Sequence, residues 1–290
     1  MAPELKTMPP EPKWLRVAME RIFVDAVPAQ HKGLQQILQS FPADVIVGDD
    51  MFFGVLPMLL GPRSKRPPIV LCGTSILYWR REDGAPMFAG LPPATARAQR
   101  DEYAAAYRDH DRLIYQPVAD RLNRSLEKMG VGPLTMTLFD SVVPLADVYM
   151  QLSVPSCEFP RDIPRSVQFV GAPPIIPNQA PLPPWAHELD GSRKIVLVTQ
   201  GPVANHNFGL LVAPTPQALR EAVRTALDTS DYRSRARLMA DESEAMETRV
   251  EIPHIIAQIA RSAKHEPRQV AVAADRSRRA IRRAAAAPST

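Results

Sequence analysis

The chain has 290 residues, long enough for two domains of about 100 to 200 residues each, and 45% of them are hydrophobic, enough for a core. The net charge of +4 belongs to the last 30 residues, which carry eight Lys/Arg against two acids, so the other residues sum to −2 and nucleic-acid binding is not expected. Neither a secretory signal nor a membrane-spanning run is apparent, and Cys72 and Cys157 have no metal or redox spacing, so we expect a cytoplasmic protein without a metal.

The first hundred residues predict helices and strands in alternation. Apolar residues at helical spacing indicate two amphipathic helices, one over residues 14–23 and one over 34–41. Residues 44–49 predict a buried strand that ends in glycine and an acid. An apolar helix over 52–60 and a strand over 68–73 follow, and this order is typical of a parallel sheet.

The next hundred residues continue an α/β pattern. Residues 95–129 carry apolar side chains at mostly helical spacing, and residues 148–152 and 167–170 predict two more short strands. The proline-rich segment 172–192 has few periodic apolar positions, which suits a semi-rigid linker. We therefore place a domain boundary there, after a first domain over 1–171.

The remaining residues predict a second domain with too few strands. The apolar run Ile195–Val198 is typical of a strand buried on both faces, and no further strand-like run follows it. Thr215 and Pro216 predict a helix start, and helices are expected over 232–248 and 252–262. A lone strand leaves its backbone groups unpaired, so we interpret 193–264 as the remnant of a domain and 265–290 as a basic disordered tail.

Three segments carry a resemblance to a known family. Residues 44–49 (DVIVGD), residues 149–161 (YMQLSVPSCEFPR) with 167–174 (VQFVGAPP), and residues 194–201 (KIVLVTQG) occur in the order found in GT-B glycosyltransferases. The similarity is to the macrolide and UDP-glucosyl branch and runs from about residue 14 to residue 259. It implies a GT-B-like fold, with a truncated Rossmann-like acceptor domain and an incomplete Rossmann-like donor domain.

The chain also departs from this family. The glycine-rich loop with the catalytic histidine, which belongs to the family's first strand, has no counterpart here, nor does the late donor-domain loop that holds the pyrophosphate. Pro202 stands where the family prefers Thr or Ser. The chain therefore resembles a member that lacks its start and the middle of its donor domain.

The resemblance implies a few site residues, each with a simpler alternative. Asp49 is similar to the acid that orients the catalytic base, or it caps the strand. Gln200 and Gly201 would face the diphosphate of the donor, although a glycine after a strand is common. The aromatic side chains Trp79 and Phe88, with Met51, would line a pocket for a flat lipophilic acceptor, or Met51 belongs to the core.

The implied reaction is transfer of a hexose from a UDP-sugar to a hydroxyl of a small lipophilic acceptor, with inversion. Such a hexosyltransferase needs no cofactor besides the donor, but the missing segments predict impaired activity in this chain. The alternative is a non-catalytic acceptor-binding module that assists a complete transferase.

Overall fold

The computed structural model describes residues 12–87, 89–174, 180–192 and 215–264, together with Leu5, Met8 and Ile176. Several predictions concern positions outside the described residues: the strand at Ile195–Val198, the donor-binding residues Gln200 and Gly201, the pocket residue Phe88 and the basic tail over 265–290.

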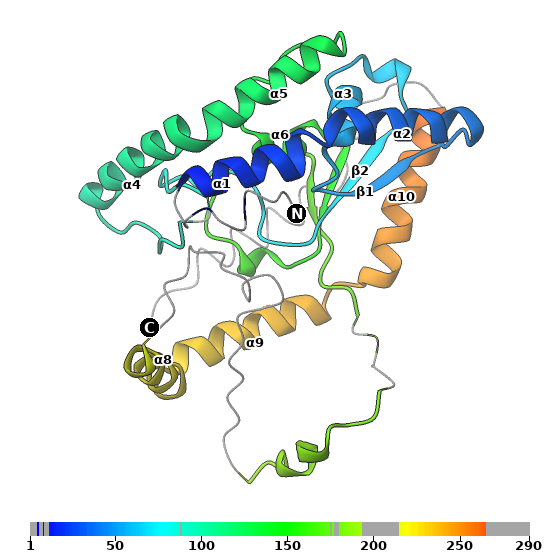
Figure 1. The fold of residues 1–290 in the computed structure, drawn as a ribbon. Coiled ribbons are helices and arrows are strands. Elements are labelled where there is room, and N and C mark those ends of the chain that lie inside the picture. The colour runs from blue at the N-terminus through cyan, green and yellow to red at the C-terminus, as the bar shows by residue number, and fades with distance from the viewer. Residues whose placement is uncertain are drawn as a thin grey trace.

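The centre of the fold is a parallel four-stranded sheet with the order β1-β2-β3-β4 (Figure 1). The strands are β1 (Ile46–Asp49), β2 (Ile69–Gly73), β3 (Val148–Gln151) and β4 (Val167–Phe169), and all neighbours pair in parallel. The four strands predicted in this region are confirmed, as is the mixed α/β class. Because each strand runs in the same direction, all the carboxyl ends meet at one edge of the sheet.

The first strand is less buried than the sequence predicts. β1 pairs only with β2 in the described sheet, and its residues alternate between buried and accessible. Val47 is 45% exposed, whereas Ile46 faces the core. A continuous apolar run indicates a strand buried on both faces, but a strand at the edge of a sheet is covered less completely.

Most helices cover one face of the sheet (Figure 1). They are α1 (Pro12–Met19), α2 (Val27–Ser40), α3 (Leu56–Leu59), α4 (Arg97–His110), α5 (Gln116–Lys128) and α6 (Leu138–Leu145). A π-helical turn at Glu20–Val24 follows α1, and another at Asp111–Tyr115 connects α4 to α5. A 3-10 turn at Phe53–Val55 precedes α3. The helical patterns over 14–23, 34–41 and 95–129 are thereby confirmed.

The core on this face is built around aromatic rings. Phe23, Phe53 and Phe139 meet edge to face, with ring centroids 5.5 to 5.7 Å apart. Such pairs stabilise a core by about 0.5–1.5 kcal/mol beyond the area they bury. The rings pack over Leu71 and Tyr149 of the two central strands, so this core holds the sheet and the helices together.

The opposite face of the sheet is covered by α10 (Thr248–Lys264). Ile255 and Ile259 share a buried cluster with Val70, Val148 and Met150, which point to that face because side chains alternate along a strand. The Thr248 hydroxyl donates a 2.6 Å hydrogen bond to the Val170 carbonyl. The helix that sequence reasoning assigned to a second domain therefore packs on the sheet of the first.

The two other late helices are α8 (Pro216–Asp228) and α9 (Ser230–Glu244). The Thr215 hydroxyl accepts a 3.2 Å hydrogen bond from the Ala218 N–H, which confirms the predicted N-cap. α9 contacts the loop after β3, where Glu242 accepts a hydrogen bond of 3.1 Å from the Ser156 N–H. No helix in the described part of the chain combines the length and the apolar character needed to span a bilayer.

The proline-rich segment forms a short 3-10 helix, Pro184–Glu188. The residues described around this helix are largely exposed, including Leu182 and Trp185. Its function as a linker, and the boundaries of the two domains, stay predictions.

Candidate functional site

Polar side chains gather at the carboxyl edge of the sheet. Asp50 directly follows β1, Gly73 ends β2, and Gln151 ends β3. In open parallel sheets, ligands bind outside this edge because the loops that leave the strands can diverge there. We therefore expect a ligand-binding or catalytic site at this edge of the sheet.

Asp50 is a buried carboxylate at this edge. It is only 1% exposed, and its Oδ2 accepts a 2.7 Å hydrogen bond from the Tyr149 hydroxyl. Its Oδ1 has no hydrogen-bond partner among the described residues. Burial raises the pKa of Asp50 to about 6, with a smaller increase from the charge of Asp49 and an opposing effect of the Tyr149 hydrogen bond. Asp50 thus has a free acceptor oxygen and a pKa near neutrality.

Gly73 is needed for this polar cluster to form. A Cβ atom at this position would lie 2.5 Å from both the Tyr149 hydroxyl and the Gln151 Oε1. Gln151 is completely buried, and its Nε2 donates a 2.6 Å hydrogen bond to the Ser75 carbonyl. Its Oε1, like the Oδ1 of Asp50, has no partner in the described part of the chain. Two buried acceptors therefore lack donors at one edge of the sheet.

Asp49, the predicted orienting acid, has a different environment. It is exposed, and its Oδ1 accepts a 2.8 Å hydrogen bond from the Met51 N–H. This contact is that of a side chain that caps the end of a strand. Sequence reasoning considered only Asp49, and the signal that could have added Asp50 is the pair of consecutive aspartates after the apolar run.

An apolar cavity of about 460 Å³ lies beside the loops that follow β2 and β3. The β2 loop contributes Leu77 and Trp79, the β3 loop Glu158 and Phe159, and α4 contributes Tyr107. The size and the mixture of an apolar wall with a few polar groups are typical of small-molecule sites. Trp79 lines this cavity, and Met51 packs against the main core, which was the alternative considered for it.

A second cavity of about 300 Å³ adjoins the first and is more polar. Both are lined by Arg80, Tyr107, Tyr115, Thr137 and Asp140. Burial raises the pKa of the Asp140 carboxyl, opposed by its hydrogen bond with Thr137 and by the charge of Arg80. A ligand in the first cavity can thus extend towards hydrogen-bonding groups in the second.

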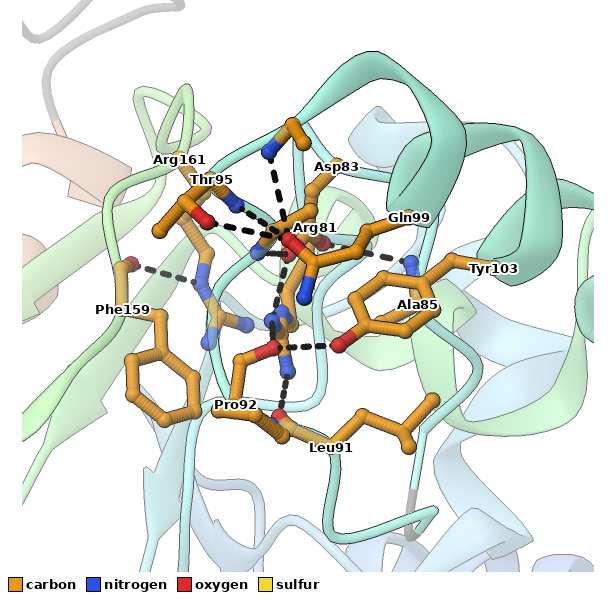
Figure 2. A network of polar contacts seen from close by, with 12 residues as sticks. Arg81, Asp83, Ala85, Leu91, Pro92, Thr95, Gln99, Tyr103, Phe159 and Arg161 are labelled. Carbon is orange, nitrogen blue, oxygen red and sulfur yellow. Dashed lines mark hydrogen bonds and ion pairs between the residues drawn. The ribbon is translucent and has the colours of Figure 1, made fainter.

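Arg81 lines the first cavity and is held by a network of polar contacts (Figure 2). Its guanidinium contacts Asp83 Oδ2 at 2.5 Å and donates hydrogen bonds of 2.7 and 3.1 Å to the Leu91 and Pro92 carbonyls. Asp83 also accepts hydrogen bonds from the Ala85 and Ala94 N–H groups. This network closes the loop before α4 on itself, so the wall is preformed.

A second ion pair joins the loops after β2 and β3. Arg161 contacts Glu158 at 3.1 Å and donates hydrogen bonds to the Leu77 and Trp79 carbonyls, at 3.1 and 2.5 Å. Glu158 in turn accepts a 2.8 Å hydrogen bond from the Leu77 N–H. Because both side chains are almost completely buried, these bonds hold Trp79 firmly in the cavity wall.

The described histidines do not serve Asp50. His31, His110 and His187 each make an Nδ1 contact with a backbone carbonyl, at 3.1, 2.9 and 2.6 Å respectively. None of the histidines in the described ranges forms a hydrogen bond with Asp50. His206, which lies closest in sequence to the predicted donor strand, is outside the described residues.

Comparison with known proteins finds several relatives that match this chain over similar lengths. The chain is 35% identical over 203 residues to 4'-demethylrebeccamycin synthase of Lentzea aerocolonigenes, a match that covers 68% of this chain and 47% of that protein. It is 30% identical over 225 residues to UDP-glycosyltransferase 2 of Phaeomoniella chlamydospora, covering 73% of this chain and 48% of the relative. UDP-glucosyltransferase B1 of Starmerella bombicola is 27% identical over 231 residues, with 76% and 51% covered.

The chain thus spans about half the length of the curated relatives it matches. No protein-family model matches it, and no solved structure does so significantly.

Proposed function

The chain belongs to the UDP-glycosyltransferase family, and we propose that it forms the acceptor-binding side of a transferase that moves a hexose from a UDP-sugar to a hydroxyl of a small lipophilic molecule. The observation that carries this proposal is the apolar cavity beside the loops that leave the carboxyl ends of β2 and β3, the same edge of the sheet at which the buried Asp50 follows β1. An acceptor in this cavity would be shielded from water on its apolar faces, with its hydroxyl free to reach the sheet edge.

The cavity wall is electrostatically linked to Asp50. Tyr78 stands between the lining residues Leu77 and Trp79. The pKa of its hydroxyl is raised by burial and, to a smaller extent, by the charge of Asp50. The charge of Asp50 thus acts on a residue whose two sequence neighbours line the cavity, while Asp50 itself is not part of the lining.

We assign the orienting acid to Asp50 rather than Asp49. A transfer with inversion needs a base that takes the proton of the acceptor hydroxyl, and an acid behind it that fixes the tautomer of an imidazole base and stabilises its protonated form. The Oδ1 of Asp50 is buried and free to accept an N–H, while Asp49 already accepts a backbone N–H. Gln200 and Gly201 remain the proposed contacts of the donor diphosphate.

Turnover by this polypeptide alone should be low, because the described histidines are not placed to serve as that base. The remaining function would then be acceptor binding in support of a complete transferase. Separate calorimetric titrations with 2-naphthol and with UDP distinguish the two cases, since an auxiliary module binds the naphthol alone and a competent enzyme binds both.

Substitution of Trp79 tests the cavity. We expect Trp79→Ala to weaken 2-naphthol binding at least tenfold, because buried aromatic anchors dominate small binding surfaces. Trp185→Ala, at an exposed tryptophan that is not part of the cavity lining, is the matched control and should bind normally. Equal affinity in both variants would remove the cavity as the acceptor site.

The assignment of the acid is tested by UDP release from UDP-glucose. Any measurable rate should fall at least tenfold in Asp50→Asn and change little in Asp49→Asn. The opposite ranking would return the role to Asp49.

A further inference from the structure

In the described structure, two of the arginines in the wall of the first cavity are paired with acids, and a third is not. Three arginines line it, namely Arg80, Arg81 and Arg161. Arg81 is neutralised by Asp83, as Figure 2 shows, and Arg161 is neutralised by Glu158. Both of these guanidiniums also donate to backbone carbonyls, so they maintain the walls and have few donors left for a ligand.

Arg80 differs from these two. Its guanidinium carbon lies 5.2 Å from the centroid of the Trp79 ring, a cation–π contact, and Arg80 lines both cavities. Within the described ranges its guanidinium forms no ion pair and donates no hydrogen bond. A guanidinium held over an aromatic ring keeps its N–H groups available around its edge, which is the geometry that binds a carboxylate with two parallel bonds.

The acidic side chains that line the two cavities form no ion pair with Arg80 in the described structure. Asp140 lines both cavities but forms no ion pair with Arg80 in the described structure; it is almost fully buried at the start of α6, and its hydrogen bond is to Thr137. Asp111 lines only the second cavity. Glu158, in the first, is already paired with Arg161.

We propose that the cavity selects flat apolar acceptors that carry a carboxylate group, and that Arg80 is the residue that binds this carboxylate. The apolar body contacts Trp79 and the neighbouring wall, and the acid group lies at the Arg80 edge between the two cavities. This inference rests on the proposed acceptor function of the cavity and adds the chemical class of the acceptor.

The test compares two ligands of nearly equal shape that differ in charge. 2-Naphthoic acid and 2-naphthamide are titrated calorimetrically into the full chain at pH 7.5 and low salt, without a sugar donor. We expect the acid to bind about five- to tenfold more tightly than the amide, and we expect added salt to reduce this ratio because it screens an accessible ion pair.

Variants of Arg80 test whether this residue causes the preference for the acid over the amide. Arg80→Gln should bring the ratio close to one while leaving the affinity for the amide nearly unchanged, and Arg80→Lys should retain part of the preference. Arg112→Gln removes an exposed arginine that lies outside both cavity linings and should keep the full ratio.

The outcomes separate the two proposals. Equal binding of acid and amide by the unmodified chain, or a ratio that survives in Arg80→Gln, overturns the carboxylate inference and leaves the acceptor site standing. Failure of both naphthalene ligands, together with failure of 2-naphthol, overturns the acceptor site itself and the inference with it.

Discussion

At the scale of single residues, the site depends on buried polar groups that lack part of their hydrogen bonds. Asp50 and Gln151 each keep one buried oxygen without a described partner, next to a glycine whose Cβ would collide with the cluster. A buried acceptor without a donor costs about 1–3 kcal/mol. Such a cost is typical of residues retained for binding or catalysis, which is why Asp50 is the central residue of our proposal.

The burial of Asp50 has a measurable effect on stability. Its pKa of about 6 in the folded chain is above the ordinary value of 3.8, so the folded state keeps a proton that the unfolded state has released over this interval. Its contribution to stability is therefore complete below pH 3.8 and is lost as the pH rises through 6. Asp50→Asn removes this loss, so its unfolding free energy relative to the unmodified chain should rise by up to about 3 kcal/mol between pH 4 and pH 7.

Urea denaturation at several pH values measures this difference. Asp101→Asn, which removes one negative charge at an exposed position of α4, is the control for the loss of charge. A difference between Asp50→Asn and the unmodified chain that does not change with pH would contradict the raised pKa.

At the scale of secondary-structure elements, α10 completes the sheet. Its apolar residues cover the face of β2 and β3 that the earlier helices leave open, and Thr248 anchors its start to the Val170 carbonyl. A parallel sheet is stable only when both faces are covered. The helix is therefore part of the fold of residues 46–170, although it follows them in the chain by nearly 80 positions.

Truncation of a side chain on the buried face of α10 should destabilise the whole fold. Ile259 is 6% exposed in the cluster with Val70 and Met150, and Ile259→Ala should lower the unfolding free energy by about 2–4 kcal/mol. Val250→Ala, at an exposed position of the same helix, should change it by less than about 0.5 kcal/mol. Equal effects in urea denaturation would show that α10 does not pack on the sheet.

At the scale of the whole molecule, the ends of the described chain belong to one packed unit. The segment between β4 and α8 passes through the exposed 3-10 helix Pro184–Glu188, while α10 returns to the sheet (Figure 1). Chain continuity through 180–192 is therefore not what holds α10 in place. The buried contacts of Ile255 and Ile259 do so.

Limited proteolysis tests this arrangement. Chymotrypsin should cut after the exposed Trp185 or Leu189, because accessible aromatic and leucine residues in a surface segment are preferred sites. We expect the two fragments to elute together from a sizing column in native buffer and to separate in 6 M guanidinium chloride. Separation without denaturant would mean that α10 is not bound to the sheet.

The four strands before residue 170, most of the helices, the N-cap at Thr215 and the family resemblance could be predicted from the amino-acid sequence, because these depend on local periodicity, local hydrogen bonds and short ordered segments. Only the folded chain shows that β1 is an edge strand of the described sheet, that α10 covers the far face, and that Asp50 rather than Asp49 is buried. The hydroxyl that holds Asp50 belongs to Tyr149, 99 residues later, and no local pattern predicts which of two adjacent carboxylates such a distant residue contacts. Burial and charge balance, which set the pKa of Asp50 and leave Arg80 available to a ligand, arise only when the separated loops meet.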